Sequence, residues 1–286
     1  MTSNIDSSLV TIGMPVYNGA RYIRRALDSI LTQNFSDFEL IISDNASTDE
    51  TSAICLEYAK RDGRIRYVRH ERNSGAAVNY NFLLEATNSK YFFFAPHDDE
   101  WLADWVSAAV EALEESTNSS IVLGTIDFVN KENELVARVS PPWSLNQITP
   151  SERIRKYLNT EITDHLLYGV IRFNCIKNFR LGLGETSPER ALIFTILASG
   201  RVADSTKMKM INHMSNKTQK ELYEFFQFNK WYLANLKSHI SVLRAFFREL
   251  QFLVAIKVVL MYLSEIVERK IFNKKRKIGN VQLYKS

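Results

Sequence analysis

Short apolar runs alternate with longer amphipathic segments along the first part of the chain. Runs of four to six strand-forming residues indicate buried β-strands, whereas apolar residues that recur every three or four positions indicate helices. We predict four strands, each followed by a helix, at residues 9–14, 38–43, 64–69 and 91–95. Repeated strand-to-helix units with short connections are typical of an α/β domain, in which helices flank a single, mostly parallel sheet.

This alternation loosens in the second half of the chain. The pattern there predicts three strands, at residues 121–129, 134–139 and 168–172, and two helices, at residues 151–158 and 189–199. Beyond Asn212 apolar residues recur at helical spacing almost to the end. We therefore expect a main domain over residues 1–211 and a helical C-terminal extension over residues 212–286.

The extension contains an apolar segment, residues 252–263, which is shorter than the about 20 residues that a membrane-spanning helix needs. A basic cluster follows it, formed by Arg269, Lys270, Lys274, Lys275, Arg276 and Lys277. Two interpretations stay open: the segment packs against the domain or a second copy of the chain, or it lies at a membrane surface with the cluster facing anionic headgroups.

The composition narrows the class of protein. With 45% hydrophobic and 24% charged residues the chain is an ordinary globular protein, and a net charge of +4 gives no reason to expect nucleic-acid binding. Cys55 and Cys175 form neither a disulfide framework nor a metal-ligand spacing, so we expect reduced thiols. The first residues resemble no signal peptide, and we expect a cytoplasmic protein.

Candidate chemistry gathers where the predicted strands end. The strand at 91–95 runs into His97, Asp98, Asp99 and Glu100, and adjacent carboxylates resist burial unless a cation offsets their charge. The simplest alternative is a solvated acidic turn. In parallel sheets, however, ligands bind beyond the carboxyl ends of the strands, which would bring this turn beside residues 15–18 and 44–45.

The segments Val10–Asn18, Ile42–Thr51 and His97–Asp99, in that order and at those separations, resemble the motifs of glycosyltransferase family 2. This resemblance covers residues 8 to 115 well, extends less clearly to about residue 205, and is absent beyond. It implies the nucleotide-diphosphosugar transferase fold, with residues 1–211 as the catalytic domain. It also implies transfer of a sugar from a nucleoside diphosphate, UDP being the expected carrier, with inversion at the anomeric carbon and a divalent Mg²⁺ or Mn²⁺ ion.

The resemblance implies roles for individual residues. Asp99 would ligate the metal, Asp98 would lie near the ribose and the metal, and Asp44 would accept a hydrogen bond from the base. Pro15, Val16 and Tyr17 would cradle that base.

Three asparagines are weaker candidates for substrate binding. Asn18 follows the cradle, yet it also fits a helix N-cap. Asn45 stands where many family members have a second acid. Asn79 would face the site if its helix is rotated as in the family.

An inverting transferase needs a general base for the acceptor hydroxyl. By resemblance this is Glu189, at the start of the helix that Gly200 closes, with Glu185 as the alternative. Glu189 also fits a first-turn acid that complements the helix dipole.

We expect an acceptor that is a glycan or a lipid-linked glycan, in cell-surface polysaccharide or lipopolysaccharide synthesis, with the protein peripheral at the inner face of the membrane. Two other functions stay open: a nucleotidyltransferase acting on sugar phosphates, and a non-catalytic protein that binds sugar nucleotides.

Overall fold

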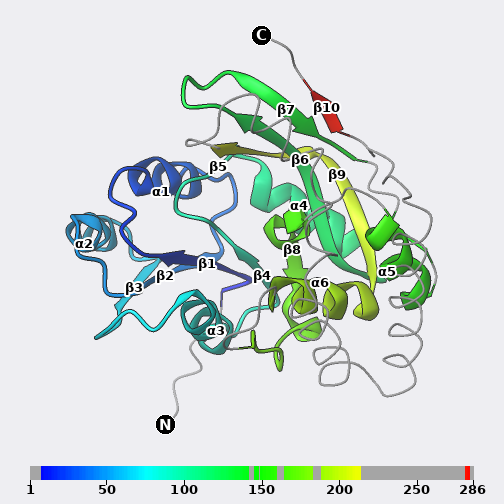
Figure 1. Cartoon of the computed structure of the whole chain (residues 1–286), viewed down its shortest axis with the longest axis horizontal. Helices are drawn as coiled ribbons and strands as arrows, with labels where there is room; N and C mark the ends of the chain where they lie inside the picture. Colours follow the sequence, from blue (N-terminus) through cyan, green and yellow to red (C-terminus); the bar gives the residue numbers. More distant parts are fainter. Residues whose placement is uncertain are drawn as a thin grey trace, which may run out of the picture.

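The computed structural model describes residues 8–141, 145–147, 149–159, 164–182, 188–213 and 281–283. In this part of the chain the strands form one sheet, and helices flank it on both faces (Figure 1). The predicted α/β class is therefore confirmed.

The first half of the sheet is parallel, with the strands in the order β4-β1-β2-β3. Its strands and the helices that follow them are β1 (Val10–Val16), α1 (Ile23–Leu31), β2 (Phe38–Asp44), α2 (Thr51–Arg61), β3 (Ile65–Arg69), α3 (Ala76–Ala86), β4 (Tyr91–Phe94) and α4 (Trp105–Glu115). Figure 1 shows α1 and α2 on one side of β1–β3 and α3 on the other. Because both faces are covered, β1 and β4 are buried along their whole length.

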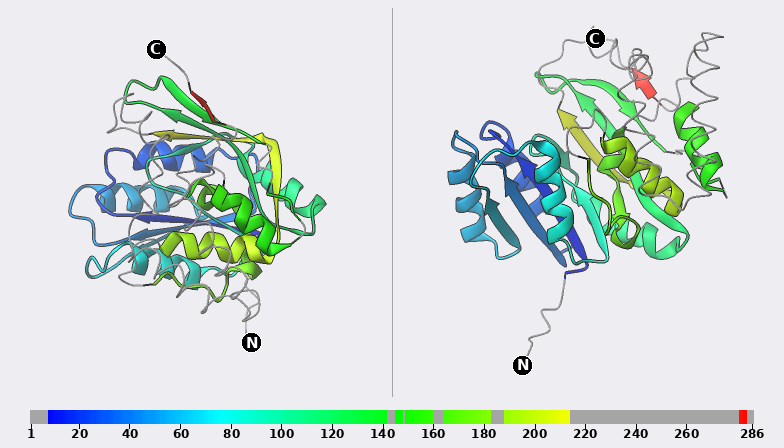
Figure 2. Two further views of the ribbon diagram at one scale, coloured as in Figure 1. Left: turned by 45° about the vertical axis from the view of Figure 1, so that its right-hand side comes forward. Right: turned by 60° about the horizontal axis from the view of Figure 1, so that its bottom comes forward.

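The second half of the sheet is mixed rather than parallel (Figure 2). A short turn at residues 130–134 joins β6 to β7, and such a connection permits an antiparallel pair. β8 is antiparallel to both β4 and β6, whereas β9 is parallel to β6. The elements are β5 (Glu100–Trp101), β6 (Ser119–Val129), β7 (Leu135–Val139), α5 (Pro150–Asn159), β8 (Val170–Arg172), α6 (Pro188–Ser199), β9 (Arg201–His213) and β10 (Val281–Leu283), with two 3-10 turns, Asp164–Tyr168 and Phe173–Cys175.

β1 continues through Pro15, although proline cannot donate to a strand ladder. The Gly13 carbonyl accepts from Ala95 N–H, next to β4, whereas the Val16 carbonyl accepts from Asn45 N–H, next to β2. Alternate residues of β1 thus face alternate neighbours, and Pro15 faces the β4 side. The ladder with β4 ends at the pair Gly13 and Phe94, so the missing N–H leaves no partner unsatisfied there.

The aromatic strand β4 packs tightly against β1. A Cβ added at Gly13 would lie 2.9 Å from the Phe92 ring, and the Phe92 and Phe94 rings meet edge to face with centroids 4.6 Å apart. These side chains are almost fully buried. The strand therefore gives the acidic turn after it a closely packed base.

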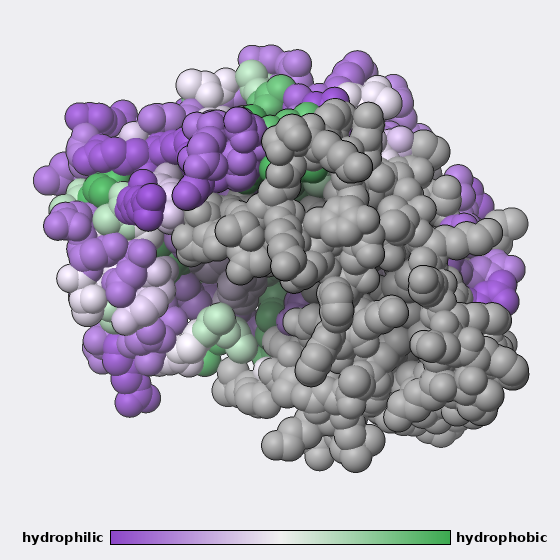
Figure 3. All heavy atoms as spheres, turned by 45° about the horizontal axis from the view of Figure 1, so that its top comes forward, coloured by the Kyte–Doolittle hydropathy of each residue, from purple (hydrophilic) through white to green (hydrophobic). Residues whose placement is uncertain are grey.

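Outer surfaces over α1 and α2 are largely hydrophilic, with scattered hydrophobic side chains (Figure 3).

Cys55 and Cys175 are both free thiols, Cys55 fully buried and Cys175 half-buried. No helix among the described residues is both long enough and apolar enough to cross a bilayer.

The expected boundary at residue 211 falls inside β9, which continues to His213. Residues 214–280, which include most of the predicted helical extension, lie outside the described residues. The division into two units therefore stays a prediction.

Candidate functional site

Three loops meet at the carboxyl end of the parallel strands, as the sequence predicts. Asn45 N–H donates to the Val16 carbonyl at 2.9 Å, which joins the loop after β2 to the end of β1. A Cβ added at Gly19 would lie 2.5 Å from Cδ2 of His97, so the His97 ring covers the loop after β1. The motif segments that follow β1, β2 and β4 are therefore neighbours in space.

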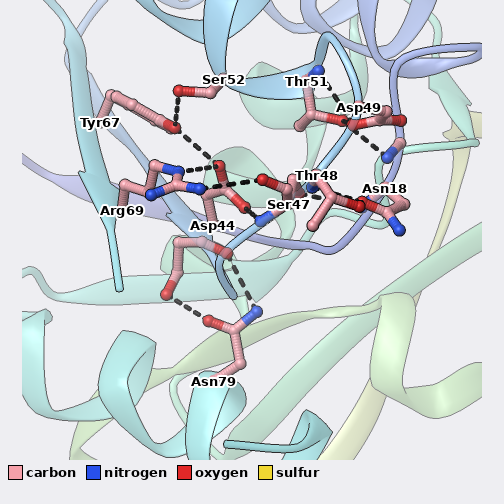
Figure 4. Close-up of polar contacts among 12 residues, drawn as sticks. Asn18, Asp44, Ser47, Thr48, Asp49, Thr51, Ser52, Tyr67, Arg69 and Asn79 are labelled. Atoms are coloured by element: carbon pink, nitrogen blue, oxygen red, sulfur yellow. Dashed lines mark hydrogen bonds and ion pairs between the residues drawn. The ribbon is translucent and has the colours of Figure 1, made fainter. Parts of the chain in front are cut away.

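Asn18 joins the first two loops instead of capping α1. Its main-chain N–H donates to Oγ of Ser47 at 2.9 Å, and its side-chain Oδ1 accepts from Thr48 N–H at 2.8 Å (Figure 4). Asn18 adopts a left-handed backbone, with φ of 53°, and α1 begins only at Ile23. The helix-cap interpretation is therefore wrong, because the amide bonds to a loop that is distant in sequence.

The start of α2 also differs from the local pattern. Ser47 and Glu50 have the spacing of a capping box, yet Ser47 bonds to Asn18 and the N-terminus of α2 carries no side-chain cap. Asp49 instead accepts from Thr51 N–H and from Ala20 N–H. Burial favours the neutral acid, but these hydrogen bonds outweigh it and hold the pKa of Asp49 below its usual value. Asp49 thus ties the first loop to α2.

The carboxylate of Asp44 is completely enclosed. Oδ1 accepts from Ser47 N–H at 2.8 Å, and Oδ2 accepts from the Tyr67 hydroxyl at 2.7 Å and lies 3.8 Å from Nε of Arg69 (Figure 4). Ala46, two residues further on, has a left-handed backbone with φ of 62°. Asp44 therefore organises the loop after β2, and its predicted contact with a base stays a prediction.

Asn45 fastens the loop before α3. Its Nδ2 donates to Oδ1 of Asn73 at 2.9 Å, and its Oδ1 accepts from Ser74 N–H at 3.1 Å. The side chain is 4% exposed. The structure thus gives Asn45 a definite positioning role, which needs an amide with both a donor and an acceptor.

Asn79 bonds to β2, and both ends of its amide are used. Nδ2 donates to the Ser43 carbonyl at 2.9 Å, while Oδ1 accepts from the Ser43 hydroxyl. The residue is buried, which places its amide against the sheet (Figure 4). Its expected contact with substrate stays a prediction that these bonds do not support.

The end of β1 presents little side chain to solvent. Pro15 and Val16 are buried, whereas Tyr17 is 44% exposed and Asn18 is exposed. In the predicted cradle, Tyr17 is therefore the side chain best placed to meet a ligand.

Asp99 lies at the centre of the acidic turn and is 1% exposed. Its Oδ2 accepts from Nδ2 of Asn212 at 3.0 Å, and its Oδ1 accepts from His213 N–H at 3.2 Å. Burial and, next, the negative charge of Asp98 raise the pKa of Asp99 well above its usual value. A bound cation would relieve this excess of negative charge.

The residues fit a hard divalent cation in their chemistry. Asp98 and Asp99 offer carboxylate oxygens, which are the ligands that Mg²⁺ and Mn²⁺ prefer, and Asp99 is buried beside a second carboxylate, an arrangement that a cation would stabilise. Among the described residues, no three His, Cys, Asp or Glu side chains are gathered as a ready metal site. Substrate oxygens would therefore have to complete the coordination.

The sequence did not predict three residues that lie around the acidic turn, namely Arg25, Asn212 and His213. Nε2 of His213 lies 2.5 Å from Oε1 of Glu100, and Nε of Arg25 lies 3.1 Å from the same oxygen. Asn212 and His213 belong to β9, a strand that we did not predict from the sequence. The alternation of buried Met208 and Met210 with charged neighbours was the available signal.

Tyr80 lies within range of the charges of the acidic turn and of Glu189. Its ring packs against Phe94 with centroids 4.8 Å apart. Burial raises the pKa of Tyr80 to about 12, and the charges of Asp98, Asp99 and Glu189 add to the effect. Glu189 is partly buried in the first turn of α6, and its proximity to the acidic pair stays a prediction. Glu185 lies outside the described residues.

Similar solved structures support this architecture. The S. aureus TarS fragment 1-349 with UDP-GlcNAc matches with a TM-score of 0.63 and 16% identity, over 91% of this chain and 72% of that chain. Mannosyltransferase PcManGT from Pyrobaculum calidifontis, with GDP-Man and Mn2+, matches with a TM-score of 0.55 and 16% identity, over the same shares. At such identities the likeness concerns the fold.

Related sequences are also glycosyltransferases by name. The putative teichuronic acid biosynthesis glycosyltransferase TuaG of Bacillus subtilis is 40% identical over 107 residues, 37% of this chain and 42% of the relative. The Escherichia coli UDP-Glc:alpha-D-GlcNAc-diphosphoundecaprenol beta-1,3-glucosyltransferase WfgD is 30% identical over 138 residues, 48% of this chain and 53% of the relative. The matched stretch thus spans less than two thirds of either relative.

The family itself follows from the longest match. The model of Glycosyl transferase family 2 matches residues 11–179, more than half of the chain, and this range contains the three loops that meet beyond β1, β2 and β4. Sequence motifs, strand order and loop geometry agree, and the chain belongs to glycosyl transferase family 2.

Proposed function

We propose that the protein is an inverting glycosyltransferase that passes a sugar from a UDP-linked donor to an acceptor hydroxyl, in the synthesis of a cell-surface polysaccharide or lipopolysaccharide. The observation that carries this proposal is the meeting of the three motif loops at the carboxyl ends of β1, β2 and β4. The names of the relatives TuaG and WfgD support the pathway class, and WfgD and the TarS complex with UDP-GlcNAc support UDP as the carrier.

Donor binding would begin at the ends of β1 and β2. The exposed Tyr17 offers a ring to the base, while Pro15, Val16 and Asn18 shape the backbone around it. Asp44 would accept the base N–H only if Tyr67 or Arg69 moves aside, because the carboxylate is enclosed between them.

Asp98 and Asp99 would hold the Mg²⁺ or Mn²⁺ ion. When bound, the ion would supply stabilisation of the negative charge that develops on the leaving diphosphate. Asn212 and His213 keep the Asp99 carboxylate oriented through their two hydrogen bonds.

Glu189 would act as the general base. It would take the proton of the acceptor hydroxyl as that oxygen attacks the anomeric carbon and the bond from this carbon to the diphosphate oxygen breaks. Attack from the face opposite the leaving group inverts the configuration. The position of Glu189 in the first turn of α6 matches the family resemblance and supports this role, and Glu185 is the alternative.

Substitution distinguishes the two candidate bases. Glu189→Gln should lower kcat roughly 10²- to 10⁴-fold, the usual contribution of a general base, and leave donor binding unchanged. Glu185→Gln is the control. If Glu185→Gln lowered kcat in this way and Glu189→Gln did not, Glu185 would be the general base.

A lipid-linked glycan acceptor would suit a protein that associates with the inner face of the membrane through its basic C-terminal cluster. The full chain should sediment with vesicles that contain anionic lipid. A variant with Lys274, Lys275, Arg276 and Lys277 replaced by Gln should not. Equal sedimentation of the two proteins would remove this part of the proposal.

The donor can be tested by melting the full chain with a set of nucleotide sugars, with and without Mn²⁺. A ligand at a hundred times its Kd adds about 2.7 kcal/mol to the apparent stability. We expect stabilisation by UDP-sugars that depends on the metal. If none binds, or if the protein releases diphosphate from a nucleoside triphosphate and a sugar phosphate, the proposal fails.

A further inference from the structure

Helix α1 and the residues just after it present a row of three polar side chains to the acidic turn. Arg25, Ser29 and Gln33 are spaced four residues apart, so they lie on one face. Nη2 of Arg25 donates to the Asp98 carbonyl at 3.0 Å, and Oγ of Ser29 accepts from Trp101 N–H at 3.2 Å. Nε2 of Gln33 donates to the Leu102 carbonyl at 2.8 Å, and its Oε1 accepts from Val106 N–H at 3.0 Å.

Arg25 differs from the other two because it also reaches charged groups. Its Nε lies 3.1 Å from Oε1 of Glu100, the oxygen that lies 2.5 Å from Nε2 of His213. The main-chain N–H of His213 in turn donates to Asp99. A continuous series of contacts therefore runs from α1 through Glu100 and His213 to the carboxylate proposed to bind the metal.

We propose that Arg25 is a positioning residue of the donor site, which holds the acidic turn and the end of β9 in the arrangement that Asp98 and Asp99 need to bind a metal-linked diphosphate. This inference rests on the proposed function. It extends that function to a residue outside the three motif loops, one that touches neither substrate nor reacting atoms.

The physical argument is electrostatic and geometric. Asp98, Asp99 and Glu100 are consecutive acids that repel one another, and the Arg25 guanidinium places a positive charge beside them. Its planar fork contacts a carbonyl and a carboxylate at once, which the single ammonium of lysine does less well. The Arg25 side chain is 34% exposed, so its effect should fall mainly on the turn and little on the core.

The neighbouring arginine provides a matched control. Nη2 of Arg24 donates to Oε2 of Glu57 on α2 at 2.8 Å, and the side chain is 49% exposed. Arg24→Met and Arg25→Met both remove one positive charge from α1, and they change the side-chain volume by the same amount. They differ in whether the acidic turn loses a contact.

The first experiment measures UDP binding with Mn²⁺ by calorimetry, and steady-state transfer, on the full chain. Arg25→Met should raise the Kd for UDP and the donor KM roughly tenfold, because ligand binding must then order the released turn, with a smaller change in kcat. Arg25→Lys should recover part of the affinity, and Arg24→Met should match the wild type. Wild-type affinity in Arg25→Met, or equal loss in both Met variants, would overturn the inference.

The second experiment needs no ligand and separates this inference from the proposed function. Amide hydrogen exchange of peptides covering residues 98–101 and 211–213 should be faster in Arg25→Met than in Arg24→Met, with equal protection in β1 and β4. If wild-type protein fails to bind UDP, the proposed function fails, and this measurement still tests Arg25. Unchanged exchange around the turn would show that Arg25 does not hold it.

Discussion

Asp99 and His213 lie 114 positions apart in the sequence, yet the main-chain N–H of His213 donates to Oδ1 of Asp99 at 3.2 Å. The acid comes from the turn after β4, and its donor comes from the last residue of β9. The metal-binding candidate is therefore held by a strand outside the region where the sequence motifs lie.

Replacing Asp99 with Asn should stabilise the unliganded protein and remove metal-dependent UDP binding. Burial raises the pKa of Asp99, so the ionised wild type loses stability as the pH rises above the usual carboxyl value of about 3.9. Asparagine carries no such charge. Its Oδ1 still accepts from His213 N–H, and its Nδ2 meets the oxygen of the Asn212 amide once that amide flips. We therefore expect about 1–3 kcal/mol more stability for Asp99→Asn at pH 8. Urea unfolding and calorimetry measure both effects. A less stable variant that still binds UDP with Mn²⁺ would contradict the assignment.

Asn45→Asp should destabilise the loop before α3, although it restores the acid common in the family. The new carboxylate would face Oδ1 of Asn73, which also accepts from Gly75 N–H at 2.9 Å and therefore cannot turn away. We expect a loss of about 1–3 kcal/mol in urea unfolding. Asn73→Asp is the control, because its carboxylate keeps both acceptor roles. Equal effects of the two changes would refute this explanation.

Gly19→Ala should disturb the contact between the loops after β1 and β4. The added Cβ would lie 2.5 Å from Cδ2 of His97 and 2.7 Å from Cγ2 of Val16, so both side chains or the loop itself must shift. We expect a loss of about 1–3 kcal/mol in stability together with weaker UDP binding. At Gly63 nothing lies within 4 Å of an added Cβ, and Gly63→Ala should be neutral or slightly stabilising. The idea would fail if both variants melted alike.

Asp127 should contribute stability that acid removes. Its side chain is 7% exposed, and it contacts Nε of Arg138 at 2.5 Å and Nζ of Lys209 at 2.8 Å. Burial favours the neutral acid, but these bonds outweigh it and lower the pKa of Asp127. The contribution is therefore complete above the usual carboxyl pKa of about 3.9 and is lost as the pH falls through the lower folded value.

Asp127→Asn should consequently cost about 1–3 kcal/mol at pH 7, and the difference from wild type should shrink below about pH 4. Urea titrations across this range measure it. Glu111→Gln, which breaks the exposed pair with Lys207, should change little at any pH. A difference for Asp127→Asn that persists unchanged at pH 3 would contradict this account.

The sequence predicted the parallel half of the fold because each of its strands and helices is recognised from the spacing of apolar residues within a short segment. The buried run of β4 and the amphipathic face of α1, with Ile23, Ala26 and Ile30 buried, follow directly from residue spacing. The loops were placed together by the rule for parallel sheets. Their internal bonds were not predictable, because Asn18 and Ser47 each fit a local cap and instead pair across 29 residues.

The missed part of the site has a similar physical cause. β9 carries charged and polar residues at many positions, and its buried alternation is clear only at Met208 and Met210. Without that strand, nothing in the sequence placed Asn212 and His213 beside Asp99. In the sequence, Arg25 likewise fits an exposed position on a helix, because the turn that it contacts is distant along the chain.

The left-handed backbone of Ala46 also has a practical consequence. A non-glycine residue pays about 1–2 kcal/mol for this conformation, whereas glycine adopts it freely but loses about 0.5–1 kcal/mol through its greater freedom when unfolded. Ala46→Gly should therefore raise the melting temperature slightly and leave UDP affinity unchanged. This single change offers a more robust form of the protein for crystallisation and long assays, with every group proposed to meet the donor left intact.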